Sequence, residues 1–127
     1  MTEREFTLKH IFTDVEKLEN RQNLYSPQEE HFGVEWYISI KKLNEHLGMF
    51  LWTNVTGNQE IHTNLILRIF SKNREKNHSK SSSYVFGRRI NPFDDFYGWY
   101  QFIEWRTLQD EYLDDGKLEV EVHVNLF

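Results

Sequence analysis

The last strand-like segment of the chain alternates without a break between apolar and polar side chains. The apolar positions are Leu118, Val120, Val122, Val124 and Leu126. A period of two fits a β-strand with one face buried and the other in water. The preceding Asp115-Gly116 pair suits a tight turn, because glycine tolerates positive φ. This strand is therefore expected to belong to a sheet whose apolar face packs into the protein core.

Similar but less regular strand patterns occur earlier in the chain, at residues 6–12, 34–41, 47–53, 61–70 and 83–86. More strand is expected within residues 97–105, whereas residues 13–23 and 107–112 are long enough only for a helical turn each. The polar segment 72–83 is expected to be a mobile loop. Many short strands without strand–helix alternation predict a mainly β fold, an antiparallel β-sandwich.

Composition agrees with this fold class. Aromatic residues make up 16% of the 127-residue chain, prolines number 2, and alanine, the best helix former, does not occur. We expect one domain spanning residues 1–127, with its core within 6–126. There is no cysteine, no signal-like segment and no apolar run of membrane-spanning length. We therefore expect no membrane association and a cytoplasmic location, with the nucleus as the alternative.

No arrangement of residues points to catalysis. The six histidines lack the spacing that would place two of them on one metal, and adjacent carboxylates on an extended chain point to opposite faces. The sequence has no phosphate loop and no nucleophile elbow. A net charge of −5 with dispersed basic residues argues against nucleic acid. We expect no enzyme activity, no metal and no cofactor; an enzyme would need a catalytic domain outside this chain.

The segment 47–52 is apolar on both faces of its expected strand. Leu47, Met49 and Leu51 share one parity, while Phe50 and Trp52 share the other. Only one face of a strand looks into the core of a two-sheet sandwich, so a loop, a neighbouring chain or a ligand must cover the second. A second aromatic-rich segment raises the same question, with Phe93, Phe96, Tyr97, Trp99, Tyr100 and Phe102. These rings either line an exposed groove for protein recognition or are buried beneath loops that fold back over the sheet.

Six short motifs follow one another along the chain. The first four are Phe6-x-Leu8 with Phe12, Tyr25-Ser26, His31-Phe32-Gly33-Val34-x-Trp36-x-Ile38 and Leu47-x-Met49-Phe50-Leu51. In this order they resemble a MATH (meprin and TRAF homology) domain, in the style of the divergent MATH domains of nematodes. Residues 97–103 then resemble the family's Trp-Gly-Phe-x-x-Phe-Ile segment, with Tyr97 in place of the tryptophan. Residues 112–118 resemble its Leu-x-Asp-Asp-x-Leu ending. The resemblance runs from about Phe6 to Leu126, nearly the whole chain.

The resemblance implies an eight-stranded antiparallel sandwich with a shallow groove that holds an extended peptide of a partner protein. Many relatives also carry a BTB domain and act as substrate adaptors of cullin ubiquitin ligases. Oligomerisation would then come from regions outside this chain. Carried over position by position, the peptide contacts are Phe50, Leu65, Tyr84, Tyr97 and Trp99, with Tyr100 in place of a basic residue. A core role for Leu65 is at least as consistent with its parity.

One departure from the family concerns charge. The Lys-Asp pair that precedes the tryptophan in the adaptor branch is Asp95-Phe96 here, next to Asp94. Opposite charges attract across interfaces, so we hypothesise a more apolar or basic ligand than the Ser/Thr-rich peptides of that branch. The alternative function is a carbohydrate- or ligand-binding β-sandwich that uses the same aromatic rings as a stacking platform.

Overall fold

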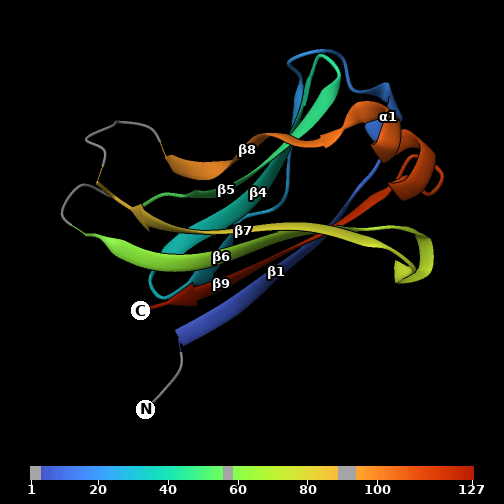
Figure 1. Cartoon of the computed structure of the whole chain (residues 1–127). Coiled ribbons are helices and arrows are strands. Elements are labelled where there is room, and N and C mark those ends of the chain that lie inside the picture. Colours follow the sequence, from blue (N-terminus) through green and yellow to red (C-terminus); the bar gives the residue numbers. More distant parts are fainter. Residues whose placement is uncertain (1–3, 56–58, 89–93) are drawn as a thin grey trace.

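The computed structural model describes residues 4–55, 59–88 and 94–127. Two antiparallel sheets pack face to face, which confirms the predicted mainly β sandwich (Figure 1). Sheet A has the order β1-β9-β6-β7. Its strands are β1 (Arg4–Phe12), β9 (Leu118–Leu126), β6 (Ile61–Phe70) and β7 (Asn77–Phe86). Sheet B has the order β2-β4-β5-β8, with β3 also paired to β4. Its strands are β2 (Asn23–Tyr25), β3 (Glu29–His31), β4 (Val34–Leu43), β5 (His46–Thr53) and β8 (Asp95–Glu104).

The described part of the chain has nine strands, one more than the eight that the family resemblance implies. The two short strands β2 and β3 both pair with β4, on the edge that β5 does not occupy. Pro27 lies between them and has no N–H to donate to a ladder. Together β2 and β3 therefore act as one interrupted edge strand.

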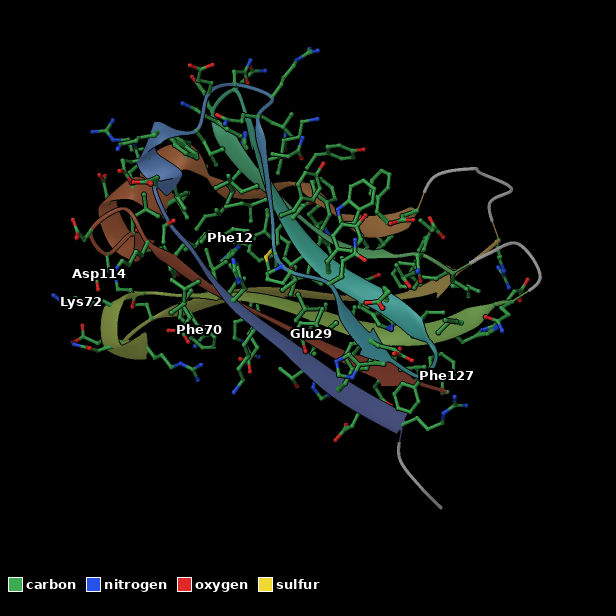
Figure 2. The ribbon with its side chains drawn as sticks, turned by 180° about the vertical axis from the view of Figure 1, so that it is seen from behind. Phe12, Glu29, Phe70, Lys72, Asp114 and Phe127 are labelled. Atoms are coloured by element: carbon green, nitrogen blue, oxygen red, sulfur yellow. The ribbon has the colours of Figure 1, made fainter. Side chains whose placement is uncertain are left out.

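The core lies between the inner faces of the two sheets. Val120, Val122 and Val124 of β9 are fully buried, as the alternating sequence predicts, and β9 pairs with β1 on one side and β6 on the other. Trp36 and Ile38 of β4 face them from sheet B and are also fully buried. Figure 2 shows from behind how side chains such as Phe12 fill the space between the layers.

The two expected helical turns are present as η1 (Val15–Lys17) and η3 (Leu108–Tyr112). Two further short turns, α1 (Trp105–Thr107) and η2 (Lys72–Arg74), lie where the sequence predicts strand and loop. Lys72 lies 3.9 Å from Asp114 across one end of the sandwich (Figure 2). No helix in the described ranges is long and apolar enough to cross a membrane.

The prediction of a loop over residues 72–83 is wrong for most of that segment. β7 begins at Asn77 and pairs with β6 along ten residues, so the connection is short. β7 is the edge of sheet A, where side chains alternate between exposed and half-buried positions. An edge strand of this kind can be built almost entirely from serine, lysine and histidine, because little of it enters the core.

Candidate functional site

The open edges of the two sheets meet along β7 and β8. Every second side chain of β7 points across to β8, and we call this line of contacts the β7–β8 seam. His78 Nε2 lies 2.8 Å from the carbonyl oxygen of Phe102, and Lys80 Nζ donates to that of Gln101 at 3.2 Å. Farther along, Ser82 Oγ lies 3.0 Å from the hydroxyl of Tyr97. Side chains rather than a backbone ladder therefore bridge the two edge strands.

Three aromatic rings form one wall of the seam. The ring of Tyr84 stacks on Tyr97 with centroids 4.4 Å apart, and Tyr97 meets Trp99 edge-on at 5.8 Å. All three pack against the core while remaining partly exposed. The structure thus brings together Tyr84, Tyr97 and Trp99 among the residues predicted for the site, on the rim of the sandwich.

Phe50 and Tyr100 lie on the other face of sheet B. Tyr97 pairs with Leu51 and therefore faces the core, while Phe50 pairs with Gly98 and points outward. The Phe50 ring lies against two glycines. A Cβ added at either Gly48 or Gly98 would come within 2.9 Å of a ring atom. Phe50 is only 3% exposed, covered in part by Tyr100, whose ring centroid is 5.0 Å away. Parity correctly places Phe50 off the core, but not beside Trp99.

Leu65 belongs to the core. It lies on β6, is 1% exposed and packs with the inner faces of the sheets. In this structure it offers no surface to a peptide, in agreement with the parity that it shares with Leu67 and Ile69.

Asp94 and Asp95 do not give the seam the negative charge on which the hypothesis of a basic ligand rests. The Asp95 carboxylate is buried and accepts hydrogen bonds from the Tyr84 hydroxyl at 3.1 Å and the Gly87 amide at 3.1 Å. Asp94 accepts a 2.7 Å hydrogen bond from Tyr37 on the outer face of sheet B. Burial, together with the Asp94 carboxylate, raises the pKa of Tyr37. Neither aspartate presents a free negative charge to the seam.

Sequence reasoning missed the polar half of the seam. The polar composition predicts a loop for His78, Lys80 and Ser82, although they continue with Tyr84 and Phe86 in a period of two. A hollow of about 380 Å³ opens at the His78 end, between β7, β8 and the helical turns. His46, Lys80, Glu104 and Tyr112 are among its lining residues. Phe93, which belonged to the aromatic segment of the sequence, lies outside the described residues.

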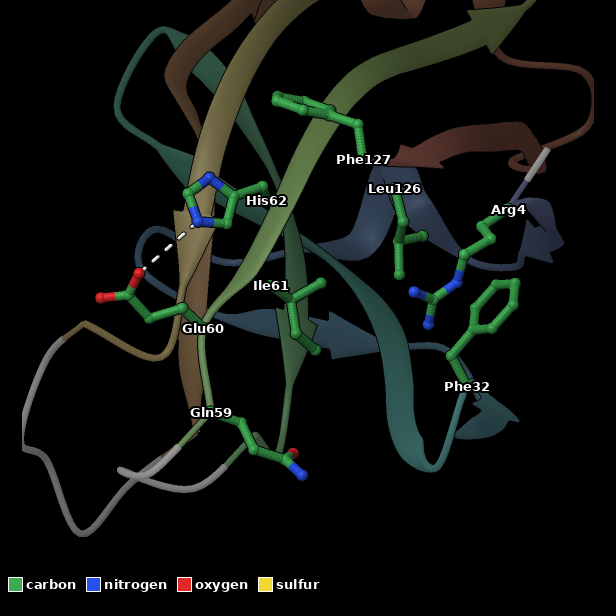
Figure 3. A pocket seen from close by; sticks show the side chains of 8 residues that line it. All are labelled: Arg4, Phe32, Gln59, Glu60, Ile61, His62, Leu126 and Phe127. Atoms are coloured by element: carbon green, nitrogen blue, oxygen red, sulfur yellow. Dashed lines mark ion pairs between the residues drawn. The ribbon is translucent and has the colours of Figure 1, made fainter. Parts of the chain in front are cut away.

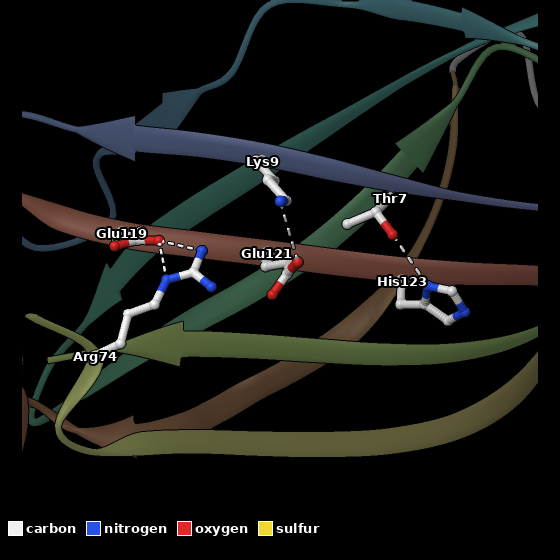
Figure 4. A network of polar contacts seen from close by, with 6 residues as sticks. All are labelled: Thr7, Lys9, Arg74, Glu119, Glu121 and His123. Carbon is white, nitrogen blue, oxygen red and sulfur yellow. Dashed lines mark hydrogen bonds and ion pairs between the residues drawn. The ribbon is translucent and has the colours of Figure 1, made fainter.

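Several other charged side chains on the surface contact a neighbouring side chain. A hollow of about 310 Å³ near both chain ends is lined by Arg4, whose guanidinium lies over the Phe32 ring, and by His62, 3.5 Å from Glu60 (Figure 3). The outer face of sheet A carries a further network in which Arg74 binds Glu119 at 2.6 Å (Figure 4). Residues 4–55, 59–88 and 94–127 contain no cluster of side chains suited to a metal ion.

Comparison with known proteins agrees with the fold. The MATH domain family matches residues 12–126. BTB and MATH domain-containing protein 45 of Caenorhabditis elegans is 31% identical over 122 residues, which cover 94% of this chain and 25% of the relative. BTB and MATH domain-containing protein 15 of the same organism is 29% identical over 124 residues, covering 97% and 44%. The chain thus spans less than half the length of these relatives.

Proposed function

The chain belongs to the MATH domain family of non-catalytic protein-interaction modules, and we propose that it binds an extended peptide of a partner protein along the β7–β8 seam. This proposal rests on one observation, that the free edge of β8 lies beside a partly exposed wall of aromatic rings. An edge strand can pair with an added strand through its backbone, while neighbouring pockets select side chains. The seam offers both kinds of contact within one line of residues.

Binding at this edge would exchange hydrogen bonds rather than create all of them anew. The carbonyl oxygens of Gln101 and Phe102 are already engaged by Lys80 and His78. A peptide N–H that replaces these side chains keeps each carbonyl satisfied and frees two polar groups to contact the ligand. Tyr84, Tyr97 and Trp99 would supply the apolar contact, since aromatic rings bury much area for little side-chain entropy.

We further propose that the natural protein uses this domain to recognise substrates for a cullin ubiquitin ligase. The support is the similarity to two proteins whose names pair a BTB domain with a MATH domain. A cytoplasmic or nuclear location would accompany this role. A single shallow groove binds weakly, so self-association through another part of the protein would raise avidity.

The test is selection of binders from a random peptide library displayed on phage, using the purified domain. Selected peptides should share a motif and lose at least tenfold in affinity for Trp99→Ala or Ser82→Arg, of which the second fills the seam without touching the core. Ile11→Ala is the matched control, because it removes an exposed apolar side chain from β1 in sheet A, outside the seam. Folded variants of both kinds that bind like wild type would refute the seam as the binding site.

A further inference from the structure

The outer face of sheet B carries aromatic rings where a solvent-facing sheet normally has polar side chains. We call the group formed by Tyr25, Tyr37, Trp52 and Phe96 the outer aromatic face. Trp52 stacks on Phe96 with centroids 4.5 Å apart and on Tyr37 at 5.8 Å, with planes 7° apart. Tyr25 meets Trp52 edge-on at 6.2 Å and is 54% exposed. The face is thus continuous and open to a partner.

Hydrogen bonds hold these rings in place. The Trp52 indole N–H donates to Ser39 Oγ at 2.7 Å, and the Tyr37 hydroxyl donates to Asp94 at 2.7 Å. Ser39 is fully buried beneath the rings. The ring orientations are therefore set before any ligand arrives, which lowers the entropic cost of binding.

Carboxylates border the outer aromatic face. Glu30 of β3 stands directly opposite Glu35 of β4, and Asp94 lies beside Tyr37. Like charges directly opposite each other on paired strands destabilise a sheet, so folding alone does not account for this pair. Within the described ranges, none of these three carboxylates has an ion-pair partner.

We infer that the outer aromatic face is a second docking surface, and that its occupant is an arginine-bearing segment of a partner protein. A guanidinium stacks on tyrosine and tryptophan rings and pairs with carboxylates through two parallel hydrogen bonds. This surface offers both partners side by side. It lies on the opposite face of sheet B from Tyr97 and Trp99, so it is independent of the seam.

Nuclear magnetic resonance of the labelled domain tests this directly. The probes are a short Gly/Ser peptide carrying two arginines and a matched peptide with two glutamines. The arginine peptide should shift the Trp52 indole N–H and the amides of Tyr37 and Phe96, and added salt should weaken binding. Equal shifts with the glutamine peptide, or shifts at Trp99 instead, would overturn the inference.

Charge variants supply the second arm of the test. Glu35→Gln combined with Asp94→Asn should weaken the arginine peptide about fivefold, in the range of exposed ion pairs. Asp94→Asn keeps an oxygen that accepts from Tyr37. The control double variant, Glu19→Gln combined with Asp110→Asn, also removes two negative charges at exposed sites and should leave the affinity unchanged. Unchanged affinity in the double variant, or a neutral oligosaccharide shifting Trp52 where the arginine peptide does not, would contradict the proposal.

Discussion

The Asp95 side chain links β8 to the end of β7 and to the turn that follows β7. Its buried carboxylate accepts from the Tyr84 hydroxyl, the Gly87 amide and the Phe96 amide. We expect Asp95→Asn to lose about 1–3 kcal/mol of unfolding free energy, because an amide cannot accept from all of these donors. Asp110→Asn, which affects only an exposed pair with Arg106, should change it by less than about 0.5 kcal/mol. Urea denaturation measures both; equal losses would contradict this role for Asp95.

His10 makes stability depend on pH. Burial lowers the pKa of its imidazole below the value of about 6.5 that it has in the unfolded chain. The unfolded chain therefore binds more protons, and the contribution to stability is present above about pH 6.5 and lost as pH falls through the folded pKa. His10→Gln should flatten the fall in unfolding free energy between about pH 7.5 and 5. An unchanged slope in urea titrations would refute this.

At the residue scale, parity could predict which side chains enter the core. It gave the buried valines of β9 and separated Phe50 from Met49 and Leu51. It could not predict which outward and rim residues lie together, since that depends on how β8 pairs with β5. The role of Asp95 was hidden for the same reason: its partners come from β7 and the turn after it.

At the scale of elements, the irregular pairing of β5 with β8 requires a glycine at position 98. The register shifts between Leu47 and Met49, and a Cβ on Gly98 would lie 2.1 Å from the backbone oxygen of Met49. We expect Gly98→Ala to lower the unfolding free energy by about 2–3 kcal/mol, because the backbone of β5 or β8 must move to make room for the Cβ. Gly48→Ala meets only side chains and should cost less. Thermal or urea unfolding of the two variants compares them, and equal losses would contradict the backbone clash.

Strand β7 shows where element prediction fails. Apolar alternation identifies strands that bury one face, such as β6 and β9, but the first seven residues of β7 are polar on both faces. Backbone pairing with β6 makes this segment a strand, although its side chains show no strand pattern. Edge strands are therefore the elements most easily mistaken for loops, and here the edge carries half of the proposed site.

At the scale of the whole molecule, both proposed surfaces follow from the two-sheet architecture. The sandwich leaves β7 and β8 as neighbouring free edges, and it leaves the outer side of sheet B uncovered in the described residues. The fold class and the membership of the MATH family could be read from the sequence. The sequence could not predict that the aromatic site is divided between the rim and the outer face of sheet B, because this depends on the register in which β8 pairs with β5.

The measurement that tests the seam most directly is amide hydrogen exchange in β8, with and without a peptide selected by the domain. If the peptide adds a strand to the free edge, those β8 amides that do not bond to β5 should exchange more slowly in the complex. Amides of the outward-facing residues of β4 should be unchanged. Protection confined to β4 and β2, with none at the free edge of β8, would contradict the account.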